Sequence, residues 1–406
     1  MFGRDPRFLK HDLSSAAHFA APEATFAALR AAGPLAPARL PFIGNTWFTT
    51  TYAASAEMLK NADLFARQPE IAGLKSTAHF KWWMPKTLHR LADNMMAKDD
   101  PDHRRLRGTV DHAFARRDIA SMEPQLRTTA EGILDGTKPG QTLDIAALYT
   151  REIPFRAICD LLGLTHADSE KARRMTDGIG KMTGLLSFLT AMPGLAAFRR
   201  LLESRFQAKG TPPDQGLMAL LQTSEARAAL SDDERVAMIF LLFVGGHETT
   251  QHLINGAILI LAQNREIKQQ IIADPAHLPL FIEEVFRHFA PVQMTKPRFV
   301  TADTTFHGTA LKQGVQIAAH IGCANRDPAK YQDPDTFDPR RKPNPHLGFS
   351  AGPHFCLGLM LARLEARIAL ETLFVRHPNL KITDKTLNWR PRLGMRALTT
   401  LTVKLT

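Results

Sequence analysis

Residues 349–358 read Phe-Ser-Ala-Gly-Pro-His-Phe-Cys-Leu-Gly and surround Cys356 with residues that favour turns. Apolar residues then recur every three or four positions from residue 359 onwards, so we expect a helix that begins just after the cysteine. The helix dipole and the free backbone amides at such an N-terminus favour the thiolate over the thiol. A thiolate held in this way is either a nucleophile or a metal ligand.

The spacing within this loop narrows the interpretation of Cys356. Taken alone, one cysteine among apolar residues is typical of a small packed hydrophobic side chain. The pattern F-x-x-G-x-H-x-C-x-G also places a donor, His354, two residues before the sulfur. Cys159 and Cys323 are far away in the sequence and no C-x-x-C pair occurs, so zinc and papain-like sites fit poorly. We therefore interpret Cys356 as the sole axial ligand of a metal.

Composition limits the classes of protein that remain. The chain has 406 residues, of which 44% are hydrophobic, and a formal net charge of +11. This length can bury a large core, and the odd number of widely spaced cysteines argues against a disulfide framework. The positive charge indicates either an acidic partner or a solvated face, but no nucleic-acid-binding pattern accompanies it. The polar N-terminus and the polar break within residues 236–262 predict no signal peptide and no transmembrane segment.

A second functional region lies in a long helical pattern that the capping box Ser231-Asp-Asp-Glu234 opens. Its flanks are apolar on nearly all sides, which predicts a buried helix, yet its centre reads Gly-Gly-His-Glu-Thr-Thr at residues 245–250. Each glycine costs about 1 kcal/mol relative to alanine, and a buried Glu248 costs more. This centre therefore suggests a binding site, and the alternative is that Glu248 is a structural acid paired with an arginine.

Two further pairs of charged residues occur at helical spacing. His103 and Arg107 are four residues apart and share one face of a predicted helix, where they suit a carboxylate or a phosphate. The alternative is a surface pair beside neighbouring aspartates. Glu284 and Arg287 are three residues apart, a spacing that is common on any solvated helix.

Residues 184–198 are read as an apolar loop that interrupts the helices at Pro193.

Together, and in this order, these motifs resemble those of the cytochrome P-450 family of haem-thiolate monooxygenases, in particular its soluble bacterial members. The resemblance covers the chain from about residue 99 to its end, and a β element predicted at residues 40–51 also fits. It implies a single P-450 domain over residues 1–406, with a β-rich part at about 35–95 and a helical remainder. The implied fold is mainly α with small β-sheets (α+β), with haem between the long central helix and the cysteine-loop helix.

The resemblance also implies roles for individual residues. Cys356 looks like the proximal thiolate ligand of haem iron. Thr249 and Glu248 match the oxygen-activating motif, in which Gly245 replaces the usual alanine; the threonine organises hydrogen bonds around dioxygen and the glutamate relays protons. Ser350 stands where many relatives carry glycine, and we expect it to alter the loop little. The other matches are His103, Arg107, Arg298 and His354 for the haem propionates, Phe349 and Gly358 beside the haem, and Glu284, Arg287 and Arg341 for a network that locks the cysteine loop.

The implied activity is insertion of one oxygen atom of O2 into a small organic substrate, by hydroxylation or epoxidation. Haem b is the expected cofactor, and electrons come from NAD(P)H through separate partners of the ferredoxin and ferredoxin reductase type. We expect a cytoplasmic monomer. Two alternatives stay open: a peroxide-driven peroxygenase, and a non-catalytic haem-binding or sensor protein. A basic face for an acidic ferredoxin or flavodoxin is expected from Arg104, Arg105, Arg116, Arg117 and Arg363.

The substrate pocket is expected to be mainly apolar. Its candidate walls are residues 68–96 and 176–198 together with the Gly394-Met395 region, and the specific candidates are Phe243, Val244, Val292 and Met294. Such walls favour a lipophilic substrate, for example a terpenoid, steroid, fatty acyl or polyketide compound.

Overall fold

The structure is a computed structural model of the chain, and it describes residues 8, 12–40, 43–75, 90–115, 118–176, 185–207 and 216–406. Arg116, Arg117 and parts of the predicted pocket walls, at 76–89 and 177–184, lie outside this set. The chain divides into two compact units. Unit 1 comprises Met1–Lys75, Ala130–Thr150 and Gln251–Thr406, and unit 2 comprises Ser76–Thr129 and Arg151–Thr250.

Unit 1 contains a five-stranded sheet with the strand order β1-β2-β8-β5-β3. β1 (Leu35–Leu40) and β2 (Gly44–Thr49) form an antiparallel hairpin. The sequence placed both strands within residues 40–51, but the first strand begins earlier because Leu35 and Ala36 are buried in the core. β8 (Gln316–Ala319) runs parallel to β2 and antiparallel to β5 (Arg298–Val300), and β3 (Phe65–Ala66) pairs with β5 at the edge opposite β1.

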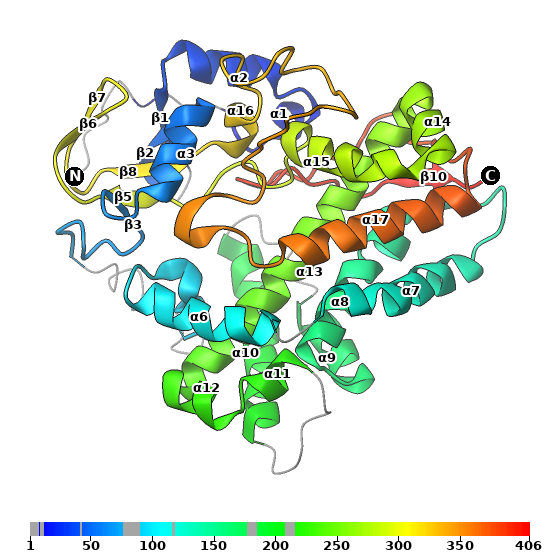
Figure 1. Cartoon of the computed structure of the whole chain (residues 1–406), viewed down its shortest axis with the longest axis horizontal. Helices are drawn as coiled ribbons and strands as arrows, with labels where there is room; N and C mark the ends of the chain where they lie inside the picture. Colours follow the sequence, from blue (N-terminus) through cyan, green and yellow to red (C-terminus); the bar gives the residue numbers. More distant parts are fainter. Residues whose placement is uncertain are drawn as a thin grey trace. The chain divides into compact units, whose positions relative to one another are not determined.

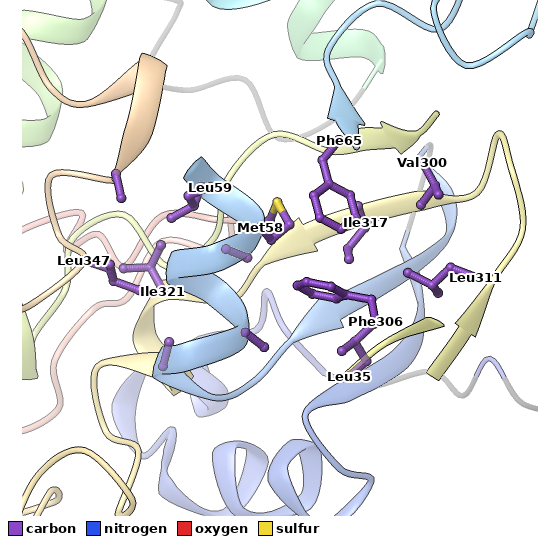
Figure 2. Packing of buried hydrophobic residues seen from close by; sticks show 14 residues of the cluster. Leu35, Met58, Leu59, Phe65, Val300, Phe306, Leu311, Ile317, Ile321 and Leu347 are labelled. Carbon is purple, nitrogen blue, oxygen red and sulfur yellow. The ribbon is translucent and has the colours of Figure 1, made fainter. Parts of the chain in front are cut away.

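Helix α3 (Tyr52–Lys60) covers this sheet in unit 1. Figure 2 shows Met58 and Leu59 on α3 within a buried cluster that includes Phe65 and Ile317 from the strands. These side chains are fully buried, and burial of a large apolar side chain contributes roughly 1.5–3 kcal/mol. The cluster therefore holds α3 firmly on the sheet.

The cysteine loop and its neighbouring helices also belong to unit 1. α15 (Leu278–His288) packs beside α17 (Leu359–Arg376) (Figure 1). The short turn η6 (Gly352–His354) contacts α3. The remaining elements of unit 1 are α1 (Ala16–Ala20), α2 (Glu23–Ala31), β4 (Thr142–Asp144), η3 (Ala146–Thr150), α14 (Arg265–Ala273), η5 (Pro275–His277), β6 (Thr304–Phe306), β7 (Thr309–Leu311), α16 (Ile321–Ala324), β9 (Lys381–Ile382) and β10 (Thr402–Lys404).

Unit 2 is helical. Its elements are η1 (Met95–Ala97), α6 (Asp102–Ala115), η2 (Ala120–Met122), α8 (Glu152–Leu162), α9 (His166–Thr176), α10 (Leu185–Gln207), α11 (Leu217–Leu220) and α12 (Ser224–Ala229), while α7 (Glu123–Asp135) and α13 (Asp232–Gln263) carry residues of both units. Helices and small sheets together give the mainly α fold that the sequence predicted.

Two predictions about the helices have clear outcomes. The capping box is confirmed, because the Glu234 backbone N–H donates to Ser231 Oγ at 3.3 Å and the Ser231 N–H donates to the Glu234 carboxylate at 2.8 Å. The predicted interruption at Pro193 is wrong, because α10 runs through it. A Cβ on Gly194 would lie 2.2 Å from the Met175 carbonyl oxygen, so this glycine serves the close packing of α9 and α10 and does not end a helix. Among the described residues, no helix combines the length and the apolar character needed to cross a membrane.

Candidate functional site

Cys356 lies in a tight loop directly before α17 in unit 1. Its backbone N–H donates to the carbonyl oxygen of Phe349 at 2.9 Å, which closes the loop. The Cys356 side chain is partly exposed, whereas Cys159 and Cys323 are buried. Burial raises the pKa of each buried thiol to about 12, so both remain protonated thiols at neutral pH. Cys356 differs from them in being accessible and in lying at a helix N-terminus, where a thiolate is favoured.

Side chains from α15 and α17 hold this loop from both sides. The Phe349 ring lies 4.2 Å from the Phe286 ring, and the Arg363 guanidinium lies 4.9 Å from the Phe349 ring centroid. Glu283 binds Arg363 at 2.8 Å and His346 at 3.1 Å. Burial raises the pKa of Glu283, but the hydrogen bonds from His346 and Arg363 outweigh this effect and lower the pKa to about 2. No local spacing connects Glu283 and His346 to the loop, so the sequence predicted no role for them, and it placed Arg363 only on the basic face.

The backbone of the loop explains two of its small residues. Gly352 has φ +69°, and a Cβ there would lie 2.5 Å from the Leu59 carbonyl oxygen on α3. Only glycine fits both the conformation and the contact. Ser350 has φ +64°, a left-handed conformation that costs a non-glycine residue roughly 1–2 kcal/mol. A glycine, which the resemblance to the family implies at this position, would avoid this cost, whereas the serine keeps the loop at a cost in backbone energy.

A buried polar network precedes the loop. Arg287 Nε and Nη2 donate to the two carboxylate oxygens of Glu284 at 2.7 and 2.6 Å, and both side chains are fully buried. Arg341 Nε donates to the same carboxylate at 3.3 Å, as do the Asp338 backbone N–H at 2.9 Å and Asn344 Nδ2 at 3.1 Å. The other Arg287 N–H groups donate to backbone carbonyls of the segment 325–336. The spacing of Glu284 and Arg287 is a weak signal in the sequence, but in the structure this pair is the centre of a network of long-range hydrogen bonds.

Two candidate propionate ligands of unit 1 are buried. Arg298 is on β5 with 1% of its surface exposed, and its Nη1 donates to the Met58 carbonyl oxygen at 3.2 Å. His354 is in η6 with 9% exposed, two residues before Cys356. Gly358 faces open space, because nothing lies within 4 Å of a Cβ built there. Buried nitrogen donors, of which Arg298 is a cation, and an open backbone therefore accompany the thiol in the same unit.

The centre of α13 in unit 2 is shaped by bonds within its own helix. Thr249 Oγ1 donates to the Gly245 carbonyl oxygen at 2.7 Å, and Thr250 Oγ1 donates to the Gly246 carbonyl oxygen at 3.3 Å. His247 Nδ1 lies 2.9 Å from the Phe243 carbonyl oxygen. Side chains that bind the carbonyl four residues earlier compete with the backbone ladder, so this turn is locally weakened.

Gly245 and Gly246 differ in what surrounds them in this turn. A Cβ on Gly246 would lie 2.8 Å from Ile158 Cδ1 on α8, so this glycine permits helix packing. A Cβ on Gly245 would meet nothing within 4 Å, so Gly245 is the glycine that leaves room for a ligand. Glu248 beside them is buried, with 7% of its surface exposed.

The candidate cations of α6 in unit 2 have acidic neighbours. His103 Nδ1 lies 3.6 Å from Asp100, and Arg107 Nε lies 3.2 Å from Asp111. Burial lowers the pKa of His103, while Asp100 opposes that effect. Arg107 thus forms the aspartate pair that the sequence offered as the alternative, while His103 is buried as a ligand would be.

The arginines of the predicted basic face also have partners. Arg104, Arg105 and Arg363 each form an ion pair with a carboxylate. These pairs reduce the positive potential that the sequence alone suggested.

The four specific pocket candidates occupy different surroundings. Phe243 is fully buried, and its ring lies 4.7 Å from Phe198, so the structure places it in the apolar core of unit 2. Val244, the next residue on α13, is partly buried. In unit 1, Val292 forms an isolated β-bridge with Met395, and a Cβ built on Gly394 would lie 3.1 Å from Met294 Cγ.

Comparison with known proteins agrees with this geometry. The family model for cytochrome P450 matches residues 196–386. A biotin biosynthesis cytochrome P450 of Bacillus subtilis is 32% identical over 88% of this chain and 89% of its own length. The vitamin D(3) 25-hydroxylase of Pseudonocardia autotrophica is also 32% identical, over 92% of this chain and 90% of its own length. The crystal structure of a myxobacterial cytochrome P450 in complex with myristic acid matches with a TM-score of 0.85 and 31% identity, covering 97% of this chain and 98% of that one.

The chain therefore belongs to the cytochrome P450 family. It is a P450 monooxygenase, a class that uses haem and dioxygen. The residues of unit 1 fit such a cofactor: Cys356 offers a thiol at a helix N-terminus, Gly358 leaves open space beside it, and Arg298 and His354 supply buried nitrogen donors.

Proposed function

We propose that this monooxygenase inserts one atom of dioxygen into a C–H or C=C bond of a lipophilic small molecule. Its electrons come from NAD(P)H through a separate acidic ferredoxin or flavodoxin. The observation that carries the proposal is the accessible Cys356 before α17, held by packing on Phe349 and by a buried network around Glu284. A network of this extent around a loop with one thiol supports a fixed ligand position.

Haem, when bound, supplies the oxygen-activating chemistry, and the residues of the chain hold it in place and set the charge around it. The Cys356 Sγ is the iron ligand, and the amides at the start of α17 stabilise its negative charge. His103, Arg107, Arg298 and His354 bind the carboxylates of the cofactor. Glu284, Arg287 and Arg341 hold the segment that leads into the loop, so the sulfur keeps its position when the cofactor is bound.

Thr249 and Glu248 control protons in the proposed reaction. The Thr249 hydroxyl donates its hydrogen to the Gly245 carbonyl oxygen, which leaves the lone pairs of Oγ1 to accept from a water or a protonated oxygen. The Glu248 carboxylate, one residue earlier, is the group that exchanges protons with solvent. Gly245 provides the space for the ligand beside Thr249.

The names of similar proteins support a lipophilic substrate. Solved structures with TM-scores of 0.85 and 0.84 contain myristic acid and a hexadec-9Z-enoic acid ligated acyl carrier protein, respectively. The apolar Val292, Met294 and Met395 of unit 1 are chemically consistent with such a substrate.

The first test is the absorption spectrum of the dithionite-reduced protein with and without carbon monoxide. We expect a strongly red-shifted Soret band in the wild type and its loss in Cys356→Ser, since a serine hydroxyl does not replace the thiolate. Cys159→Ala serves as the control and keeps the band, because Cys159 is buried elsewhere. Absence of the band in intact wild-type protein contradicts the proposal.

A second test separates the monooxygenase from a peroxide-driven peroxygenase. In Thr249→Ala we expect less product per NAD(P)H consumed in the presence of redox partners, while peroxide-driven turnover changes little. Thr250→Ala is the matched control, because its hydroxyl makes the equivalent bond one position later. Unchanged coupling in Thr249→Ala counts against the proposed role.

A further inference from the structure

Helix α14 of unit 1 carries cations on a face that is open to solvent. Arg265 and Lys268 are three residues apart and Ile272 follows four residues later, so the three share one face of the helix. Arg265 and Ile272 are exposed, and Lys268 is partly exposed. This face of α14 therefore presents two cations and one aliphatic side chain to its surroundings.

Two lysines of the small sheet β4-β10-β9 extend this charged surface. β9 and β10 pair antiparallel in a register that sets Lys381 directly opposite Lys404, and both side chains are exposed. Directly opposite residues point to the same face of a sheet, with Cβ atoms about 4.5–5.5 Å apart. The charge of Lys381 also acts on the amine of Lys268, so the sheet and the α14 face are neighbours. We call Arg265, Lys268, Lys381 and Lys404 the basic cluster.

The fold places these cations where their charge costs stability. Arg265 is the first residue of α14, where the positive end of the helix dipole disfavours a cation. Like charges directly opposite each other on paired strands, as at Lys381 and Lys404, are also destabilising.

No acidic side chain within the described parts of the chain forms an ion pair with the basic cluster, and Glu266 of α14 pairs with none of its members. Burial lowers the pKa of the Lys268 amine, and the charges of Arg265 and Lys381 lower it further. An anion from outside the chain would therefore offset the repulsion that the fold leaves in place.

The composition of the basic cluster favours a lipid surface over a folded protein or a nucleic acid. Three of its four cations are lysines, whose flexible and hydrated ammonium groups can follow mobile phosphates without a fixed geometry. α14 has no aromatic residue, whereas aromatic side chains are typical anchors of protein interfaces and of single-stranded nucleic-acid sites. Exposed Ile272 instead suits the boundary between lipid head groups and acyl chains.

We propose that the basic cluster binds the anionic surface of a membrane by contacting the phosphates of its lipids. The contact is peripheral, because it needs only side chains on the surface of α14, β9 and β10. This inference goes beyond the proposed function and does not rest on it. A lipophilic substrate dissolved in the same membrane would be concentrated beside the protein.

Cosedimentation of the holoprotein with vesicles tests the proposal. We expect binding to vesicles of phosphatidylcholine mixed with phosphatidylglycerol, none to phosphatidylcholine alone, and a decrease at high salt. The double variant Lys381→Gln/Lys404→Gln should bind the mixed vesicles about tenfold more weakly or less, since each lysine near such a surface contributes to binding. Lys330→Gln/Lys342→Gln is the matched control, because it removes two exposed lysines elsewhere in unit 1. The proposal is wrong if the wild type does not bind mixed vesicles, or if both double variants bind them equally well.

Thermal unfolding measures the electrostatic cost without a membrane. Lys404→Gln removes the repulsion from Lys381, so its unfolding midpoint at low salt should be at least that of the wild type, and added salt should raise it less. A lower midpoint that salt does not restore would mean that the fold itself compensates the charge, and this overturns the inference.

An acidic protein is the competing occupant of the basic cluster. If Lys381→Gln/Lys404→Gln loses affinity for an acidic ferredoxin but keeps its affinity for mixed vesicles, the cluster serves a protein partner and the proposal is wrong. None of these measurements depends on turnover, and the carbon monoxide spectrum of the wild type is recorded in parallel. Failure of the proposed monooxygenase function is therefore distinguishable from failure of membrane binding.

Discussion

The cysteine loop of unit 1 and the central turn of α13 in unit 2 are the two regions to which we assign the chemistry, and they are held in different ways. The loop depends on residues distant in the sequence: Phe286 and Arg363 pack on Phe349, and Gly352 contacts Leu59. The α13 turn depends on its own helix, since its side chains bind carbonyls four residues earlier.

The proposed ligand position and the proposed proton-transfer groups thus lie in regions of different rigidity. A ligand bond needs a sulfur in one place, and a network of long-range contacts supplies that rigidity. Proton transfer needs hydroxyl and carboxylate groups that can change partners, and a weakened helical turn permits this. Substitutions in the loop should therefore cost more stability than substitutions in the turn.

The largest expected effect is that of Glu284→Gln. Removing one charge of a buried pair leaves Arg287 uncompensated, which should lower the free energy of unfolding by about 3–5 kcal/mol. Denaturant unfolding followed by circular dichroism measures this change. Asp303→Asn is the control, because its pair with Lys312 is exposed, and we expect no measurable change there. Equal effects of the two variants would refute a special contribution of the buried network.

The next effect is a pH dependence that comes from Glu283. Its pKa of about 2 in the folded protein is below the unfolded value, so its stabilisation is fully present above about pH 4.5 and is lost as the pH falls towards 2. The stabilisation is on the order of 2 kcal/mol after allowance for partial exposure. Thermal unfolding between pH 7 and pH 3 should show a smaller acid slope in Glu283→Gln than in the wild type. Identical slopes would mean that Glu283 does not contribute.

A smaller loss is expected for Gly352→Ala. The left-handed backbone and the contact with the Leu59 carbonyl oxygen both oppose a Cβ, at a combined cost of roughly 1–3 kcal/mol. Gly308→Ala is a matched control, since Gly308 has φ +79° but no atom within 4 Å of the added Cβ. Chemical denaturation should show a larger loss of stability for Gly352→Ala than for Gly308→Ala. A larger loss for Gly308→Ala would mean that the contact with the Leu59 carbonyl oxygen does not account for the cost.

Ser350→Gly should have the opposite sign. Glycine removes the penalty of the left-handed conformation, and the gain, reduced by the greater chain entropy of unfolded glycine, is up to about 1 kcal/mol. Ser350→Ala should show no such gain, because alanine keeps the Cβ. Differential scanning calorimetry measures both, and a destabilised Ser350→Gly would show that the serine side chain makes a compensating contribution.

The smallest effect is expected in the α13 turn. Gly245→Ala should stabilise the protein by about 0.5–1 kcal/mol, because alanine favours the helix and its Cβ meets open space. Gly246→Ala should not stabilise the protein, since its Cβ would approach Ile158. Urea unfolding of the two variants measures the difference in stability. Destabilisation by Gly245→Ala would show that the turn depends on its glycine for more than ligand access.

Much of the candidate site could be predicted from the sequence because its signals are local. The F-x-x-G-x-H-x-C-x-G loop, the capping box at Ser231 and the Glu-x-x-Arg pair each lie within ten residues. The resemblance to the family rests on the order of such motifs, and the relatives confirm that family. The uninterrupted α10 could not be predicted, because Gly194 is explained only by its approach to Met175 in another helix.

Turn residues, caps and helical periodicity act over a few positions, so the sequence alone predicted the cysteine with its following helix and the long helix with its weakened centre. The class of chemistry came from the resemblance of the ordered motifs to the family. The long-range contacts of the candidate site emerged only from the tertiary structure. It brings Glu283 to Arg363 and His346, and it distinguishes Gly246, which packs against Ile158, from Gly245, which faces open space. These outcomes depend on burial and on distances between residues far apart in the chain, and no local pattern encodes them.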